Sequence, residues 1–483
     1  MERIAKNTVI YIYGGVLPRI ISFFLLPIYT RYLSPYEYGI IGAMEVITFL
    51  LTIIFSLEIN RSIYRCYFDY YTEKEKKEFL GTVTIGMLIN SVVWILVIFS
   101  AKGVIEKIYK TIDFYPYYFL VIIATFFSIF WFIPKAYFQV TEQAGKFVIF
   151  SILIFLLETG FNVYFIIFKR MGAKGMFIGR VISQVLMFPM CIYLIAKVAN
   201  FKFNFDKFKN AINFSLPMVP ILLSSWVLNL VDRVFIERYF DLKEVGIYSL
   251  GFRIGSMITL FTDSFNRAYS PIFYKLATLK NDGEVKTILS KYNYNFVMAV
   301  FFLTFLIILF SKEIIMLFDK RYTEAAKVLP VITMGFFFLC ASSIFNLSIY
   351  QVKKTKLMMV IMLLGSGIKI AFNFAFIPSL GMYGASYATL FSFFIIFFMK
   401  YFYSKKCYFV WINLGKIFLN LLIFLFVVHS LKFFYEIFEI DMVLMFFVKI
   451  LVFSVILWLI FPGGIKKIIN MVKRDPKVEG ENG

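Results

Sequence analysis

The chain has 483 residues, of which 61% are hydrophobic, 20% are aromatic and only 16% are charged. A soluble domain is about 45–50% apolar and about 25% charged, so this composition excludes an ordinary soluble protein. The excess apolar residues come in runs of about 20 or more, the length of a helix that crosses a bilayer. We therefore expect an all-α, polytopic membrane protein.

The formal net charge is +21 at pH 7. Nucleic-acid binding would need a basic face on a soluble module, and no segment between the apolar runs is long enough to form one. We interpret the positive charge as a topology signal and as attraction to anionic lipid head groups. Membrane lipids are therefore expected partners, and nucleic acid is not.

The apolar runs predict about fourteen spans in chain order. The first six cover approximately residues 8–30, 38–60, 79–101, 115–138, 147–168 and 175–197. The next six cover approximately 213–236, 245–268, 292–311, 327–350, 357–378 and 381–402. Two more, 412–431 and 441–461, follow. The predicted units are an N-lobe at 1–205, a C-lobe at 206–405, a final helix pair at 406–462 and a basic tail at 463–483.

Positive charge sets the predicted orientation. With the N-terminus inside and alternating spans, the cytoplasmic segments hold about twice as many Lys and Arg residues as the outer segments, which is the bias of cytoplasmic loops. Both termini are therefore expected on the cytoplasmic side of a bacterial inner membrane. The first span carries Pro18, Arg19 and Pro27 and no small-residue cleavage site, so we expect no cleaved signal peptide.

A duplicated unit organises most of the chain. The stretch RYLSPYEYGIIG at 31–42 recurs as RYFDLKEVGIYS at 238–249, and GAKG recurs as GMYG. The matched residues are Glu37 with Glu244, Gly39 with Gly246, Gly172 with Gly381 and Gly175 with Gly384. Each copy has an even number of spans, so the copies run the same way up, and the matched turns are expected on one membrane face.

The sequence lacks a catalytic or metal-binding constellation. His429 is the single histidine, and the four cysteines have neither metal nor redox spacing. A single histidine nearly excludes a His-based metal site and a Ser-His-Asp triad, and the sequence has no G-x-x-x-x-G-K-[S/T] phosphate loop. We therefore expect no metal, no cofactor and no enzymatic activity.

Function is then expected to depend on charged residues inside the spans. A charge at the bilayer centre costs roughly 2.5–3.5 kcal/mol on insertion scales, so it usually faces a cavity or a partner. Arg19 lies halfway along the first span, directly after Pro18, where the helix can bend. We predict that Arg19 lines a central cavity and binds substrate, with Arg253 and Lys369 as weaker candidates. Candidate coupling or ion-pair residues are Glu45, Glu158, Asp232 and Asp263.

Structural pairing is the alternative interpretation of these charges. Glu45 on the second span is the expected structural partner of Arg19. Asp263 and Arg267 are spaced by one helical turn and are expected to pair locally. Other residues expected to form ion pairs or to reach a membrane face are the neighbours Asp232 and Arg233, and Arg180 and Lys449.

Several motifs point to one family. They are LSPYEYG after the first span, FSLPMVP and LVDRVFI at the ends of the seventh, EVGIYSLGFRI after it, and the two Gly-x-x-Gly loops. With these motifs on two six-span halves and two further spans, the sequence resembles the polysaccharide-transporter branch of the multidrug/oligosaccharidyl-lipid/polysaccharide exporters. The resemblance covers about residues 1–405. It implies a V-shaped pair of lobes that flips undecaprenyl-pyrophosphate-linked sugar repeat units, as in the Wzx-type O-antigen or capsule flippases.

We therefore predict a flippase for lipid-linked oligosaccharide that works by alternating access. Its expected partners are that substrate, membrane lipids, and the polysaccharide polymerase with its chain-length machinery, and the chain is expected to be a monomer. One alternative is a lipid II flippase, which shares the helical plan. Another is a multidrug antiporter, which would favour acidic cavity residues. A membrane glycosyltransferase or polymerase is a weaker alternative, because it would need an acidic site in a sizeable loop and no predicted outer loop is long enough to suggest one.

Overall fold

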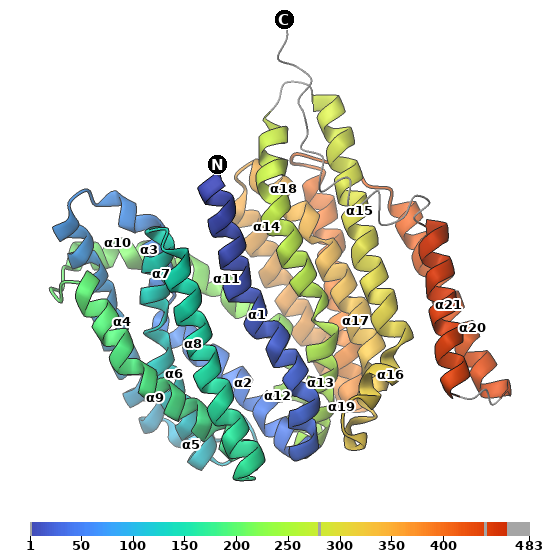
Figure 1. Ribbon diagram of the computed structural model, residues 1–483, viewed down its shortest axis with the longest axis horizontal. Helices are drawn as coiled ribbons and strands as arrows, with labels where there is room; N and C mark the ends of the chain where they lie inside the picture. Colours follow the sequence, from blue (N-terminus) through green and yellow to red (C-terminus); the bar gives the residue numbers. More distant parts are fainter. Residues whose placement is uncertain (1, 279–281, 439–441, 461–483) are drawn as a thin grey trace, which may run out of the picture.

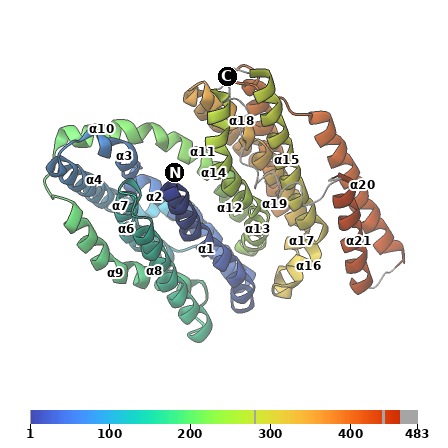
Figure 2. The ribbon, with the colours of Figure 1, turned by 45° about the horizontal axis from the view of Figure 1, so that its top comes forward.

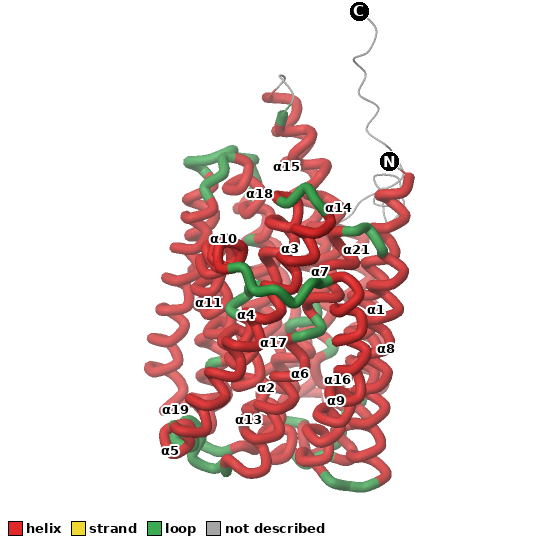
Figure 3. The backbone as a smooth tube through the Cα atoms, turned by 90° about the vertical axis from the view of Figure 1, so that its left-hand side faces the viewer, coloured by secondary structure: helices red, strands yellow, loops and turns green. Residues whose placement is uncertain are grey.

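The computed structural model describes residues 2–278, 282–438 and 442–460 (Figure 1). The protein is 87% helical, and no strand occurs in these ranges, which confirms the predicted all-α class. Most helices run between two ends of the molecule, where the connecting loops gather (Figure 3). The predicted basic tail at 463–483 lies outside the described residues.

The first half of the chain contains the helices α1 to α9. Their bounds are α1 Glu2–Tyr32, α2 Pro35–Ser56, α3 Asn60–Cys66, α4 Glu73–Ser100, α5 Lys102–Ile105, α6 Phe119–Ile129, α7 Phe132–Val140, α8 Ala144–Val163 and α9 Gly172–Val198. Short π-helical segments at Phe114–Tyr118 and Tyr164–Phe168 extend α6 and α8.

The second half contains α10 to α19, and two helices follow it. The bounds are α10 Phe205–Ser215, α11 Val219–Leu230, α12 Asp232–Tyr239, α13 Leu242–Gly255, α14 Ile258–Ala277, α15 Asp282–Leu309, α16 Ser311–Met316, α17 Ala325–Ala341, α18 Ser343–Gln351, α19 Thr355–Ser404, α20 Leu414–Phe438 and α21 Met442–Ile460. Helices α3–α9 lie on one side and α13–α19 on the other, with α20 and α21 beyond the latter (Figures 1 and 2).

Eleven helical stretches of the described chain are long and apolar enough to cross a membrane, so this is a multi-pass membrane protein. The predicted count of fourteen is not confirmed. Two expected spans, 357–378 and 381–402, form the single 50-residue helix α19, which is interrupted at Gly381 (φ 54°, ψ −133°). A straight helix of this length would measure about 75 Å, more than twice the roughly 30 Å hydrocarbon core. The interruption therefore divides α19 into two segments, each long enough to cross the membrane.

The repeated turns begin equivalent helices in the two halves. At the start of α2, the Ser34 hydroxyl accepts from the Glu37 amide (3.2 Å), and the Glu37 carboxylate accepts from the Ser34 amide (2.8 Å). This capping box, with Pro35 in the first turn, fixes where α2 begins. At the start of α13, the Asp241 carboxylate accepts from the Glu244 amide (2.8 Å).

The two turns also pack directly against each other, at the end of the molecule opposite the N-terminus (Figure 1). A Cβ atom on Gly39 would lie 1.7 Å from the Leu242 carbonyl oxygen, and one on Gly246 would lie 1.9 Å from that of Pro35. Only glycine allows α2 and α13 to approach this closely. The matched turns thus lie on one face, as parallel copies require.

A second matched pair explains why the Gly-x-x-Gly loops recur. Gly172 and Gly381 both have positive φ, 58° and 54°. A Cβ on Gly172 would lie 1.8 Å from the Glu37 carboxylate, and one on Gly381 would lie 2.5 Å from that of Glu244. The same Glu244 oxygen accepts from the amide of Met382 (3.0 Å). In each half, therefore, the glutamate of the repeated turn, Glu37 or Glu244, packs against the first glycine of the Gly-x-x-Gly loop.

Helix α10 follows the predicted lobe boundary at 205/206 but lies against the first half. Lys207 on α10 forms an ion pair with Glu78 on α4 (3.0 Å). A Cβ on Gly86 of α4 would overlap the ring of Phe208 at 2.2 Å. This helix therefore links the two halves along the N-terminal end of the molecule (Figure 1).

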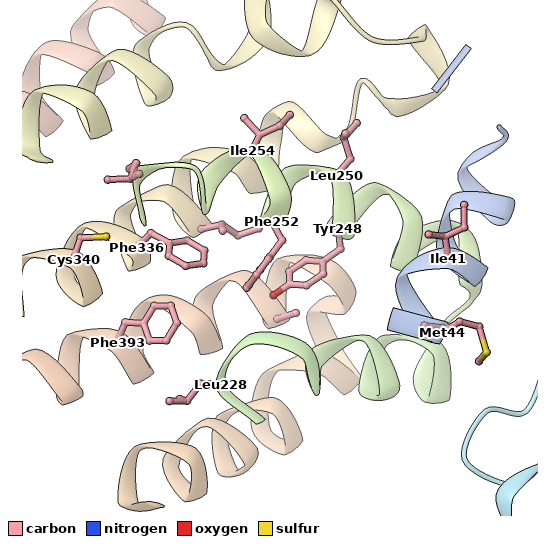
Figure 4. Packing of buried hydrophobic residues seen from close by; sticks show 14 of the residues in the cluster. Ile41, Met44, Leu228, Tyr248, Leu250, Phe252, Ile254, Phe336, Cys340 and Phe393 are labelled. Carbon is pink, nitrogen blue, oxygen red and sulfur yellow. The ribbon is translucent and has the colours of Figure 1, made fainter. Parts of the chain in front are cut away.

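Aromatic packing forms the core of the second half. Figure 4 shows Tyr248 and Phe252 of α13 beside Phe336 of α17 and Phe393 of α19. The Phe252 and Phe336 rings lie 5.1 Å apart, edge to face, and the Phe336 and Phe393 rings lie 5.4 Å apart. This core holds α13, which supplies one wall of the cavity described below.

Single-cysteine labelling tests the predicted orientation. Thr72 precedes α4 and Asp113 follows α5, so the two residues mark opposite ends of one crossing. In a cysteine-free background on intact cells, we expect Asp113→Cys to react with an impermeant thiol reagent and Thr72→Cys to react only after permeabilisation. The reverse pattern would contradict the orientation that the positive charges predict.

Candidate functional site

A cavity of about 670 Å³ lies between helices of both halves. Three arginines and three carboxylates line it, each from a different helix. They are Arg19 of α1, Glu45 of α2, Glu158 of α8, Arg180 of α9, Arg253 of α13 and Asp263 of α14. We call it the central cavity.

These six residues form three ion pairs, each between two helices. The pairs are Arg19–Asp263 (3.5 Å), Arg180–Glu158 (3.1 Å) and Arg253–Glu45 (2.5 Å). Arg253 also donates to the hydroxyl of Tyr38 (3.3 Å). The charges of the cavity therefore balance, and the first and third pairs join the two halves of the chain.

The ion pairs that the structural alternative predicted for Arg19 and Asp263 were wrong. That alternative paired Arg19 with Glu45, and Asp263 with Arg267, but Arg19 and Asp263 contact each other across the cavity. Their side chains are 56% and 51% exposed, so solvent screens the pair, and such pairs contribute only about 0–1 kcal/mol. Arg19 is therefore accessible to a ligand, as a cavity residue must be.

Arg180 is a cavity residue to which the sequence assigned only structural pairing. It contacts Glu158, and both side chains are mostly buried. One signal in the sequence could have predicted this pair. Glu158 and Arg180 have opposite charges and lie on consecutive spans, which the short loop at Gly172 joins as a hairpin.

Lys369 does not line the central cavity, so the structure does not place it where the sequence predicted. Its side chain is fully buried, and the ammonium lies 2.9 Å from the Asp232 carboxylate and 2.5 Å from the Thr389 hydroxyl. Asn373 (2.8 Å) and Tyr248 (2.5 Å) also donate to Asp232. Asp232 therefore pairs with Lys369 rather than with its neighbour Arg233, which donates instead to Ser249 and to the Asn229 carbonyl.

Two further cavities continue from the central one. The second, of about 570 Å³, shares Glu45, Glu158 and Arg180 with it. The third, of about 470 Å³, shares Glu58, Arg61 and Phe132 with the second and reaches α3, α10 and the short segment Leu216–Met218 that follows α10. Since α3, α7 and α10 lie near the N-terminal end (Figures 1 and 3), the three cavities lead from the centre toward that end.

Hydrogen bonds between the two halves close the opposite end. They join Tyr322 to the Leu33 carbonyl (3.0 Å), Thr111 to the Glu237 carboxylate (2.8 Å) and Arg321 to the Thr30 carbonyl (3.2 Å). Arg321 also donates to Asp319 (2.7 Å), and this hydrogen bond lowers the pKa of the Asp319 carboxyl. The packed turns at Gly39 and Gly246 lie at the same end.

Comparison with known families and relatives agrees with this architecture. Residues 4–277 match the family described as polysaccharide biosynthesis protein, and residues 217–375 match the MatE family. A protein of the Lsg locus of Haemophilus influenzae is 20% identical over 279 residues, which cover 56% of this chain and 66% of that protein. An uncharacterized membrane protein of the same organism is 22% identical over 292 residues, which cover 58% and 67%. The chain thus matches about two thirds of the length of these relatives.

Solved structures share the fold. The lipid II flippase MurJ in an inward closed conformation superposes with a TM-score of 0.74 at 17% identity, over 95% of this chain and all of that one. An inward-facing multidrug resistance MATE family transporter gives a TM-score of 0.62 at 13% identity, over 82% and 97%. A transporter from Pyrococcus furiosus whose binding pocket is described as having reversed polarity gives 0.54 at 13% identity, over 84% and 95%.

Proposed function

The chain belongs to the polysaccharide biosynthesis protein family, within a superfamily of membrane flippases and transporters, and we propose that it flips undecaprenyl-pyrophosphate-linked oligosaccharide across the bacterial cytoplasmic membrane. The repeat units would serve O-antigen or capsule synthesis. Both termini would be cytoplasmic, and a polysaccharide polymerase with its chain-length machinery would receive the product.

One observation carries this proposal: three arginines converge on a cavity between the two halves. A pyrophosphate presents several anionic oxygens, and the planar guanidinium fork of arginine binds such groups in a bidentate manner. Arg19 is the most accessible of the three, with its side chain 56% exposed. The pyrophosphate would bind there while the lipid tail stays in the bilayer.

The ion pairs suggest how binding would drive the transport step. An incoming pyrophosphate competes with Asp263 for Arg19 and with Glu45 for Arg253, and these two pairs join the halves. Exchange of either carboxylate for the ligand removes a contact between the halves. A ligand shifts a conformational equilibrium only if it binds the two states with different affinity. We propose that this competition makes the ligand bind more tightly to the state in which the two halves have separated.

A multidrug antiporter remains the second candidate because the same cavity holds three carboxylates. A cationic substrate would bind to Glu45, Glu158 or Asp263 in place of an arginine. The two candidates differ in which partner of each ion pair is essential: the arginine for an anionic lipid, the carboxylate for a cation.

Arg19→Ala is expected to reduce glycan export at least about tenfold, because loss of one charge-assisted contact to phosphate is worth roughly 1.5–3 kcal/mol. Asp263→Ala should retain export, and the Arg19→Ala/Asp263→Ala double variant should export no more than Arg19→Ala. Arg19→Lys should keep partial activity as a point charge. Export is measured in a flippase-null strain that makes the cognate glycan, at equal membrane levels of each variant.

Arg65→Ala is the matched control. Arg65 pairs with Asp69, and the exposed fractions of the two side chains, 62% and 50%, are close to those of the Arg19 pair. It lines none of the three cavities described above, so export should stay at the level of the unmodified protein. Full export by Arg19→Ala would contradict the proposal. Restoration of export in the double variant would show that Arg19 acts only through Asp263.

A further inference from the structure

Two residues that line the second cavity each have a buried polar side-chain atom without a hydrogen-bond partner among the described residues. They are the indole Nε1 of Trp131 and the amide Oε1 of Gln184. Trp131 is 8% exposed and Gln184 is 3% exposed, and both line this cavity. Leaving a buried donor or acceptor unpaired costs about 1–3 kcal/mol, so most such groups in proteins have a partner. A donor and an acceptor that both lack a partner, on two residues that line the same cavity, indicate a polar ligand.

Hydroxyl groups on α2 and α6 add acceptors to the same wall. Thr48, Thr52, Thr125 and Ser128 line the cavity, and each donates its proton to a carbonyl of its own helix, at distances of 2.7 to 2.9 Å. Each hydroxyl oxygen therefore retains a lone pair that can accept from a ligand. The wall thus offers several acceptors beside the single indole donor, which suits a ligand rich in hydroxyl groups.

Aromatic rings complete the lining. Phe49 of α2, which is 37% exposed, and Phe132 of α7 border the cavity. A pyranose ring has an apolar face of C–H groups and a rim of hydroxyls, so it needs an aromatic or apolar surface together with donors and acceptors. The cavity presents both, and its volume of about 570 Å³ lies within the usual range of roughly 300–1,000 Å³ for ligand sites.

The charged residues of this cavity are all compensated. Glu58 pairs with Arg61, Glu158 with Arg180, and Glu45 with Arg253. A ligand that binds only to the neutral hydroxyl, amide and indole groups of this cavity leaves these ion pairs intact. These groups therefore favour a neutral, hydroxyl-rich ligand.

We propose that the second cavity is a sugar subsite, in which Trp131 and Gln184 bind the glycan of the lipid-linked substrate. This inference rests on the proposed function, because the central cavity with its arginines would hold the pyrophosphate. The cavities share Glu45, Glu158 and Arg180, so a head group can extend from one into the other. The subsite gives the protein a means to distinguish a glycosylated lipid from the bare pyrophosphate carrier.

The test compares bound lipids in conservative variants. The protein is purified in detergent from cells of the source organism, and co-purified polyprenyl pyrophosphates are identified by mass spectrometry. Trp131→Phe keeps a ring but removes Nε1, and Gln184→Met keeps the volume but removes the amide. The double variant is expected to lose at least about tenfold of the glycosylated lipid. It should still bind added, sugar-free undecaprenyl pyrophosphate with unchanged affinity, which also shows that the variant is folded.

Trp411→Phe is the control, because this indole is 60% exposed and lies outside the second cavity. Equal retention of glycosylated lipid by the double variant and the unmodified protein would overturn the subsite and leave the proposed function standing. Loss of both lipids from the double variant would also overturn it, since the residues would then not be selective for sugar. If the unmodified protein binds neither glycosylated nor sugar-free pyrophosphate lipid, the proposed function and the subsite both fail.

Discussion

Gly39→Ala is expected to abolish transport while the protein still inserts into the membrane. The added Cβ would lie 1.7 Å from the Leu242 carbonyl oxygen, a backbone atom that cannot move aside without displacing α13. Alanine in place of glycine inside a helix normally stabilises by roughly 0.5–1 kcal/mol, so helix propensity cannot account for a loss. The halves would instead fail to close at this end of the molecule. Gly246→Ala should act alike, because its Cβ would lie 1.9 Å from the Pro35 carbonyl oxygen.

The measurement separates failed closure from misfolding. Ser22 lines the central cavity, so Ser22→Cys in a cysteine-free background reports on access to it. We expect an impermeant thiol reagent added outside intact cells to label this cysteine more strongly in Gly39→Ala than in the parent. Gly367→Ala is the matched control, since no atom lies within 4 Å of its added Cβ. Normal transport by Gly39→Ala, or unchanged labelling, would contradict the role of this contact.

Lys369→Met is expected to destabilise the protein more than any change in the central cavity. Lys369 and Asp232 are both fully buried, and their charged groups lie 2.9 Å apart. Removal of one partner of a buried ion pair leaves the other charge uncompensated, which costs roughly 3–5 kcal/mol. The hydrogen bonds from Asn373 and Tyr248 to Asp232 lessen this cost without supplying a counter-charge.

Thermal unfolding in detergent and the amount of folded protein in the membrane test this expectation. Asp232→Asn combined with Lys369→Met should recover much of the lost stability, because neither charge then remains buried. Lys327→Met is the control: its side chain is 65% exposed and forms only a surface pair with Glu324. A stable Lys369→Met protein that fails to transport would instead support the prediction from sequence that Lys369 binds substrate.

The fold class and the internal duplication could be predicted from the sequence because both depend on local properties. Hydrophobicity along about 20 residues decides whether a helix can cross a bilayer, whatever its neighbours are. The recurring Gly39 and Gly172 carried geometric information as well, because a close backbone approach requires glycine and a positive φ favours it. Their recurrence marks equivalent contacts in the two halves.

The count of fourteen spans stays a prediction, because a helix and a membrane span are not the same unit. The sequence predicted two spans, 357–378 and 381–402, and the structure has one helix, α19, that Gly381 interrupts with a positive φ. Hydropathy shows how apolar such a stretch is, but not whether the backbone is helical on both sides of one residue.

The ion pairs of the site were decided by tertiary structure alone. Arg19 and Asp263 are 244 residues apart, and Arg253 and Glu45 are 208 residues apart. Sequence spacing identifies which side chains share the face of one helix, but not which helix lies opposite or how each is rotated about its axis. The sequence alone therefore indicated that charged residues inside the spans would carry the function. Only the packing of α1 near α14 placed Arg19 beside Asp263 in the central cavity, and only the packing of α12 against α19 placed Lys369 in a buried pair outside it. Burial and partner depend on atoms contributed by distant parts of the chain.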